Sequence, residues 1–174
     1  MDAIKAILGR RSVRRFSDRS VESEHLLTLV RAAMSAPSAM DKRPWAFVIV
    51  TDRGVLNSLA ESLPYAAMAA DAPAAVVVCG VLSRCGPETP PDYWVQDCSA
   101  ATENLLVAAE ALGLGAVWTG VYPREERVSV VRSALGLPRD VVPLNLIPLG
   151  YPGDDTAPKD KYDESAVHWE RWGS

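Results

Sequence analysis

The apolar run at residues 74–81 limits the possible folds more than any other segment of the chain. It reads Ala-Ala-Val-Val-Val-Cys-Gly-Val, so a strand built from it has apolar residues on both of its alternating faces. A strand of this kind lies in the middle of a sheet and is covered on two sides. We therefore expect a central, doubly buried strand in which Cys79 is a packing residue.

The spacing of apolar residues predicts the other helices and strands. The strongest helix covers residues 97–113, where small side chains allow close backbone approach and Gly113 can end the helix in the left-handed conformation. The other expected helices cover residues 2–9, 22–35, 53–63, 65–71 and 124–135. The other expected strands, rich in β-branched and apolar residues, cover residues 46–51, 115–121 and 141–149.

The chain has 174 residues, which is enough for one domain. We expect residues 1–150 to form that domain and residues 151–174 to form a C-terminal arm that belongs to it. The arm carries five apolar or aromatic side chains that are unusual in a free tail: Tyr151, Tyr162, Val167, Trp169 and Trp172. We expect the arm to cross a subunit boundary and pack on a partner subunit, and packing back onto its own chain is the alternative.

Composition excludes several classes of protein. With 48% hydrophobic and 23% charged residues the chain has an ordinary globular composition. Its longest apolar run, residues 66–81, is interrupted by Asp71 and Pro73, so we expect no membrane span. The three cysteines form no Cys-x-x-Cys pair, and the first residues lack the order of a secretory signal. A reducing, cytoplasmic location is therefore expected.

The sequence lacks the common catalytic motifs. Gly113 and Gly115 follow a helix and precede a strand, which is the reverse of a dinucleotide-binding turn. There is no Walker loop and no Gly-x-Ser-x-Gly segment. His25 and His168 have no neighbours at metal-ligand spacing. We therefore expect neither metal catalysis nor a Ser-His-Asp hydrolase.

Positive charge is concentrated at the N-terminus of an acidic chain. The 18 basic and 22 acidic side chains give a net charge of −4. Residues 1–19 hold six basic and two acidic side chains, a balance of +4, so the remainder carries −8. A cluster this small differs from a nucleic-acid surface, where basic residues cover a whole face. A small anionic ligand is the better match.

The centre of this cluster is the segment RRSVRRF at residues 10–16. In an extended loop alternate side chains point the same way, so Arg10, Ser12 and Arg14 can converge while Val13 faces the body. Guanidinium groups and a hydroxyl are suitable donors to a phosphate. A phosphate site is one interpretation, and a solvated basic loop paired with surface acids is the other.

Six segments, in this order, resemble the short members of the nitroreductase family, which are FMN-dependent oxidoreductases. They are RRSVRRF (10–16), APSAMDKRPW (36–45), DCSAATENLL (97–106), GLGAVWTG (113–120), LGYP (149–152) and KDK (159–161). The resemblance implies an α+β fold in which helices flank a mainly antiparallel sheet. It also implies an intertwined homodimer with exchanged C-terminal arms and two FMN sites at the subunit interface.

The resemblance also assigns roles to individual residues. Those that would surround the FMN phosphate and ribityl chain are Arg10, Arg11, Ser12, Arg14, Gly150 and Lys161. Those that would line the isoalloxazine ring are Trp118, Thr119 and Gly120, together with the turn of Pro37, Ser38 and Ala39 from the partner subunit. Trp45 and Asn104 are expected to be structural.

Two departures from the family pattern concern charge near the flavin. Asp41 and Arg43 stand where members commonly have Asn and Gln, and Ala66 and Ala67 stand where a lysine is common. A cation near N1 and the C2 carbonyl stabilises the anionic reduced flavin. We hypothesise that Arg43 supplies this charge. The alternative is an Asp41–Arg43 surface pair that does not contact the flavin.

The implied activity is a ping-pong reaction. A hydride passes from NADH or NADPH to flavin N5, the nicotinamide leaves, and a small electron acceptor such as a nitroaromatic, a quinone, a flavin or an enone takes its place. The protein fixes the ring and tunes its charge, so no catalytic side chain is named. Two alternatives stay open: a flavin-binding protein for storage or sensing, and a phosphate-binding module without flavin. We expect neither a nucleic-acid nor a membrane partner.

Overall fold

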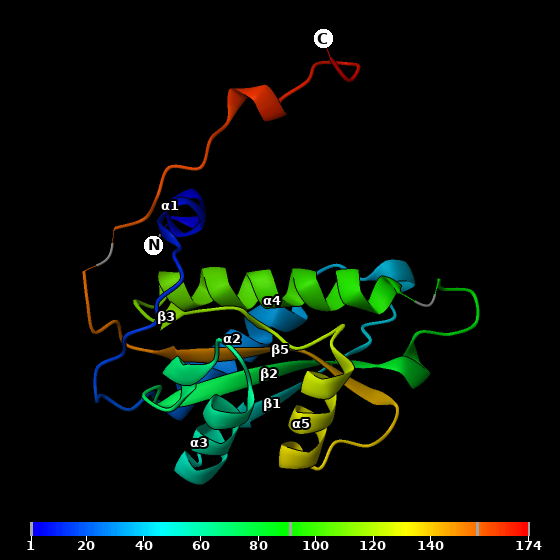
Figure 1. Ribbon diagram of the computed structural model, residues 1–174. Coiled ribbons are helices and arrows are strands. Elements are labelled where there is room, and N and C mark those ends of the chain that lie inside the picture. The colour runs from blue at the N-terminus through cyan, green and yellow to red at the C-terminus, as the bar shows by residue number, and fades with distance from the viewer. Residues whose placement is uncertain (1, 91, 156, 174) are drawn as a thin grey trace.

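A five-stranded antiparallel sheet lies at the centre of the computed structural model, which describes residues 2–90, 92–155 and 157–173 (Figure 1). The strands are β1 (Trp45–Val50), β2 (Ala74–Val81), β3 (Gly115–Ala116), β4 (Thr119–Gly120) and β5 (Val141–Gly150). Their order is β1-β2-β5-β3, and β4 also pairs with β5. The predicted central strand is confirmed, because β2 pairs with β1 and β5 and all eight of its residues are buried.

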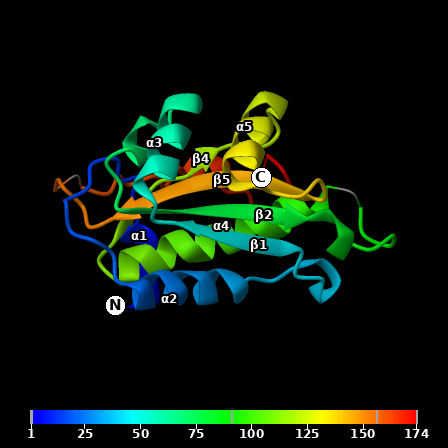
Figure 2. The same cartoon turned by 90° about the horizontal axis from the view of Figure 1, so that it is seen from below.

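Helices cover both faces of this sheet (Figure 2). They are α1 (Ala3–Gly9), α2 (Ser23–Met34), α3 (Arg53–Ser62), α4 (Tyr93–Ala111) and α5 (Glu125–Leu135), with short 3-10 turns η1 (Ala39–Asp41), η2 (Ala67–Ala69), η3 (Leu82–Arg84) and η4 (Glu164–Ala166). Helix α1 packs on the outer side of α4 (Figure 2). The successive residues Val76 and Val77 of β2 belong to opposite cores, the first shared with α2 and α4 and the second with α3 and α5. The fold is therefore α+β, with an antiparallel sheet between helical layers.

The predicted strand over residues 115–121 is wrong in one respect, because it forms two short strands. Ala116 of β3 pairs with Leu149, and Thr119 of β4 pairs with Leu146. Between them the N–H of Val117 donates to the carbonyl oxygen of Pro148 at 3.2 Å, but Pro148 has no N–H to return. The pairing of β5 with this segment is interrupted at the proline, whereas the pairing of β5 with β2 continues through it.

Helix α4 begins at Tyr93, before the predicted start at residue 97. The added turn contains Trp94, which is buried against Gly80 of β2. A Cβ at Gly80 would lie 2.3 Å from the indole ring, so the missing side chain makes room for the tryptophan. Where a helix is predicted over residues 65–71, only the short turn η2 forms.

The basic N-terminal segment runs beside β3 and is fixed by backbone contacts. Val13 is buried, as predicted, and its N–H donates to the carbonyl oxygen of Ala116 at 3.1 Å. A Cβ at Gly115 would lie 2.6 Å from the Val13 side chain, so this approach requires glycine. The N–H of Gly153 donates to the carbonyl oxygen of Arg15 at 2.9 Å, which ties the segment to the chain that follows β5.

Beyond Gly153 the chain leaves the body (Figure 1). Residues 157–173 are almost entirely exposed, and Tyr162, Trp169 and Trp172 are 74%, 73% and 90% exposed. Over these residues the arm does not bury its aromatic side chains against its own chain. None of the helices in the described ranges has both the length and the apolar character needed to cross a lipid bilayer.

Candidate functional site

A basic cavity of about 330 Å³ lies between the N-terminal loop and the C-terminal arm. Its lining residues are Arg10, Arg11, Ser12, Arg14, Ala157, Lys159 and Lys161. Five of these seven residues are cationic, and no acidic residue is among them. The convergence expected of Arg10, Ser12 and Arg14 is therefore present, and Lys161 joins them from the distant end of the chain.

Helix α4 holds the first two arginines of this loop. Arg10 Nε lies 2.9 Å from Glu103 Oε1, and Arg11 Nη1 donates to Glu110 Oε2 at 3.5 Å. Arg14 forms no ion pair within the described ranges, and neither do the two lysines of the cavity. Two cations are thus partly balanced by helix α4, and three remain for a ligand.

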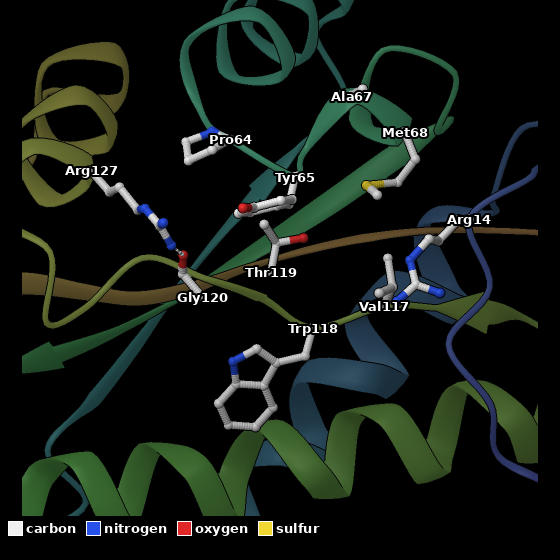
Figure 3. A pocket seen from close by; sticks show the side chains of 10 residues that line it. All are labelled: Arg14, Pro64, Tyr65, Ala67, Met68, Val117, Trp118, Thr119, Gly120 and Arg127. Atoms are coloured by element: carbon white, nitrogen blue, oxygen red, sulfur yellow. Dashed lines mark hydrogen bonds between the residues drawn. The ribbon is translucent and has the colours of Figure 1, made fainter.

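A second cavity, of about 460 Å³, adjoins the basic cavity at Arg14, which lines both. We call it the ring cavity; its lining residues are Arg14, Pro64, Tyr65, Ala67, Met68, Val117, Trp118, Thr119, Gly120 and Arg127 (Figure 3). Strand β4 supplies Thr119 and Gly120. The turn between α3 and η2 supplies Tyr65, which is 83% exposed and has a left-handed φ of 63°. This conformation costs a non-glycine residue about 1–2 kcal/mol.

A buried polar pair lies next to the strand that lines the ring cavity. Asn145 of β5 pairs with Gly120 in the β4–β5 register and is fully buried. Its Nδ2 donates to Thr102 Oγ1 at 2.9 Å, and Thr102 Oγ1 donates to the carbonyl oxygen of Cys98 at 2.7 Å. The pair links α4 to β5 directly beside β4.

The nitroreductase family model matches residues 7–64 and 55–151 of the chain, which include β1 to β5 and most of both cavities. The chain belongs to the nitroreductase family.

Similar proteins align with this chain over nearly its whole length. A Methanothermobacter thermautotrophicus protein, provisionally named NADH dehydrogenase/NAD(P)H nitroreductase, is 47% identical over 172 residues, 99% of this chain and 88% of that protein. The crystal structure of a Parabacteroides distasonis protein with the same provisional name is 48% identical, covers 98% of each chain and has a TM-score of 0.93. An FMN-dependent nitroreductase from Clostridium difficile is 27% identical, with 97% of this chain and 99% of that chain covered and a TM-score of 0.89.

The residues of the two adjoining cavities fit an FMN molecule. In the basic cavity the Nε atom of Arg11 is buried without a hydrogen-bond partner, and a phosphate supplies acceptors for such a donor. The ring cavity presents exposed aromatic surface from Tyr65 and Trp118, with Trp118 38% exposed. Arg14 lies where the two halves of the ligand would meet.

The turn at residues 37–43 lies away from both cavities within one chain. The N–H of Ala39 donates to Asp97 Oδ1 at 2.9 Å, near the start of α4. Glu110, which binds Arg11, is 13 residues further along this helix, or about 20 Å at 1.5 Å per residue. Within one chain Pro37, Ser38 and Ala39 line neither cavity, and their place beside the ring of a partner subunit stays a prediction.

Within one chain Arg43 pairs with Asp41 rather than facing either cavity. Arg43 Nε donates to Asp41 Oδ1 at 2.7 Å, and this bond holds the pKa of the Asp41 carboxyl below its usual range. Met40, Asp41 and Arg43 have left-handed φ values of 51°, 54° and 49°. The surface pair is thus formed in the chain, and a flavin contact by Arg43 stays a prediction.

Gly150 is placed differently from the other predicted site residues. It is buried at the end of β5, and a Cβ there would lie 2.6 Å from the Pro73 ring and 3.2 Å from Phe16. It lines neither of the two cavities. The close approach of Pro73 explains this glycine by packing alone.

Sequence reasoning missed several residues of the site. Tyr65, Met68 and Arg127 line the ring cavity, and Glu103 and Glu110 bind the basic loop. The spacing of the two glutamates, seven residues apart on a predicted helix, places them on one face and could have indicated a shared partner. The three cavity residues carry no comparable signal.

A polar cluster of Arg19, Glu22 and Tyr151 lies where the chain passes from residues 10–16 to α2. Arg19 Nη2 lies 2.8 Å from Glu22 Oε1, and the Tyr151 hydroxyl donates to Glu22 Oε2 at 2.8 Å. The Arg19 guanidinium also lies 3.8 Å from the centre of the Tyr151 ring. The hydrogen bond from Arg19, followed by that from Tyr151, lowers the pKa of Glu22 to about 2. The cluster connects the start of α2 to the end of β5.

Proposed function

We propose that the chain is an FMN-dependent oxidoreductase that takes electrons from NADH or NADPH and passes them to a small acceptor. The observation that carries this proposal is the pair of adjoining cavities, one cationic and one aromatic, which share Arg14. Together they match the two chemical halves of FMN. The Clostridium difficile relative is an FMN-dependent nitroreductase, which supports the choice of cofactor.

The basic cavity would hold the phosphate. Arg10 and Arg11 are preorganised by Glu103 and Glu110, so little rotamer freedom is lost when an anion binds. Arg14, Lys159 and Lys161 would add charge-assisted hydrogen bonds, each worth about 1.5–3 kcal/mol where solvent is excluded. The Ser12 hydroxyl would add one neutral donor.

The ring cavity would hold the isoalloxazine. Bound FMN supplies the redox chemistry, since it accepts a hydride from a nicotinamide and returns the electrons to an acceptor that occupies the same place. Strand β4 would position the ring, and Tyr65 and Trp118 would cover its apolar surface. Burial raises the pKa of the Cys79 thiol to about 12, so this cysteine stays protonated and supplies no nucleophile.

A homodimer with exchanged C-terminal arms would complete the site. Helices α1 and α2 expose five large apolar side chains, Ile4, Ile7, Leu8, Leu27 and Met34, each at least 50% exposed. The arm exposes Tyr162, Trp169 and Trp172. Apolar surface of this extent is typical of a protein interface. A partner subunit would cover both sets and would bring its turn at residues 37–43 toward the ring.

Titration of the apoprotein with FMN and with riboflavin tests the proposal, because riboflavin lacks the phosphate. We expect FMN to bind more tightly. Lys161→Gln should weaken FMN binding about tenfold and leave riboflavin binding unchanged, since loss of one charge-assisted hydrogen bond is worth about 1.5 kcal/mol. Arg139→Gln, at an exposed position outside both cavities, is the matched control. Equal affinity for the two flavins would refute the assignment of the basic cavity.

A further inference from the structure

Arg127 brings a positive charge to the ring cavity from helix α5. Its Nη1 donates to the carbonyl oxygen of Gly120 at 3.1 Å, and its Nε is buried without a hydrogen-bond partner. Figure 3 shows this contact, with Arg14 on the other side of the cavity. The lining residues include no carboxylate, and Arg127 forms no ion pair in the ranges that the structure describes.

The other candidate cations are placed differently. Arg14 also lines the basic cavity, where a bound phosphate would neutralise much of its charge. Arg43 pairs with Asp41 in its own chain. Ala67 and Met68, which face the ring cavity from η2, carry no charge. Neither Arg14 nor Arg127 forms an ion pair in the described chain, but Arg127 is the cation that lines the ring cavity and not the basic cavity.

We infer that Arg127 favours the reduced state of FMN by compensating the negative charge that this state carries. The inference rests on the proposed function. One hydride from NAD(P)H carries two electrons and one proton to FMN and leaves NAD(P)⁺, so the flavin gains one negative charge unless it takes up a second proton. The attraction between the guanidinium and this charge exists in the reduced state only, and it raises the reduction potential of the bound flavin.

Helix α5 itself provides a matched control. Arg132 lies on the same helix, its Nη2 donates to the carbonyl oxygen of Val141 at 3.2 Å, and its Nε is also buried without a partner. Arg132 does not line the ring cavity. Arg127→Gln and Arg132→Gln therefore remove the same charge and the same kind of contact to a backbone carbonyl, and they differ in their position relative to the ring.

The test is the reduction potential of bound FMN, measured by equilibration with a reference dye in the FMN-loaded protein, together with the dissociation constant of oxidised FMN. In Arg127→Gln we expect reduced FMN to lose about tenfold in affinity relative to oxidised FMN, a potential lower by about 30 mV for a two-electron couple. Arg132→Gln should shift the reduction potential by less than about a third of the shift expected for Arg127→Gln. Arg127→Lys should retain most of the wild-type potential, because it keeps the charge.

A potential that is unchanged in Arg127→Gln, or lowered equally in Arg132→Gln, would overturn the inference while FMN binding upholds the proposed function. If the unaltered chain binds no FMN, the proposed function fails and the inference fails with it. Arg127→Met keeps much of the length and apolar packing of the side chain. It should reproduce the lowered potential, and it replaces Arg127→Gln if that variant does not fold.

Discussion

The contact between Gly115 and Val13 connects the packing of the sheet to the basic cavity. A Cβ at Gly115 would lie 2.6 Å from Val13 Cβ, 2.6 Å from Cγ2 and 2.7 Å from Cγ1. Carbon atoms in contact normally lie about 3.5–4.0 Å apart, so Gly115→Ala must push Val13 outward by about 1 Å. Val13 is buried and lies between Ser12 and Arg14, so the cavity-lining side chains must move with it.

We expect Gly115→Ala to lower both the free energy of unfolding and the affinity for FMN. Overpacking of a buried position destabilises a protein by about 1–3 kcal/mol, which urea unfolding measures. Displacement of the loop should also remove at least one charge-assisted hydrogen bond to the phosphate, worth about 1.5–3 kcal/mol. This corresponds to FMN affinity lower by about 10- to 100-fold, which quenching of flavin fluorescence measures.

Two further variants make the test specific. Val13→Ala in the Gly115→Ala background removes Cγ1 and Cγ2, two of the three overlapping atoms, and should restore part of the FMN affinity. Gly54→Ala is the control for a glycine substitution, because a Cβ there meets Asp52 Oδ1 alone, at 3.1 Å. A Gly115→Ala protein with wild-type FMN affinity and a free energy of unfolding within about 0.5 kcal/mol of wild type would refute this account of the loop.

Three other perturbations test separate parts of the account. Glu22→Gln should lower the Tm at neutral pH, because the bond from Arg19 depresses the pKa of Glu22 from 4.5 to about 2. The difference in Tm from wild type should decrease as the pH falls from 4.5 toward 2, and a difference that is independent of pH would argue against this role of Glu22. Thr102→Val should destabilise the fold by about 1–3 kcal/mol in urea, because Asn145 Nδ2 loses its buried acceptor, and adding Asn145→Leu should recover part of the loss; no recovery would contradict the pairing. Removal of the chain beyond Gly153 should leave a folded protein by circular dichroism that is monomeric by sedimentation and binds FMN weakly; an unchanged dimer with unchanged affinity would exclude the role assigned to the arm.

The sheet and its helices were largely predictable because their signals are local. Every residue of 74–81 is apolar, so burial on both faces follows from the segment itself. The break between β3 and β4 was not predictable from residues 115–121, because its cause is Pro148 on the neighbouring strand. The early start of α4 likewise depends on Gly80, which accommodates Trp94.

The two cavities were predictable to different degrees. The alternation of residues 10–16 predicts that Arg10, Ser12 and Arg14 converge, and the family resemblance adds Arg11 and Lys161. The structure adds Lys159 to the lining of this cavity. Arg127 lies on a helix that is amphipathic in sequence, where a charged residue normally indicates the solvated face. Its place in the ring cavity results from the packing of α5 against the sheet beside β4, which is tertiary information.

The visible absorption spectrum of the purified protein, recorded during anaerobic addition of NADH and then NADPH, tests the central claim most directly. We expect the purified protein to retain stoichiometric FMN. Its flavin bands should bleach on addition of at least one nicotinamide and return when an acceptor such as a quinone or nitroaromatic is added. A protein that binds no FMN, or one whose bound flavin stays oxidised with both nicotinamides, would contradict it.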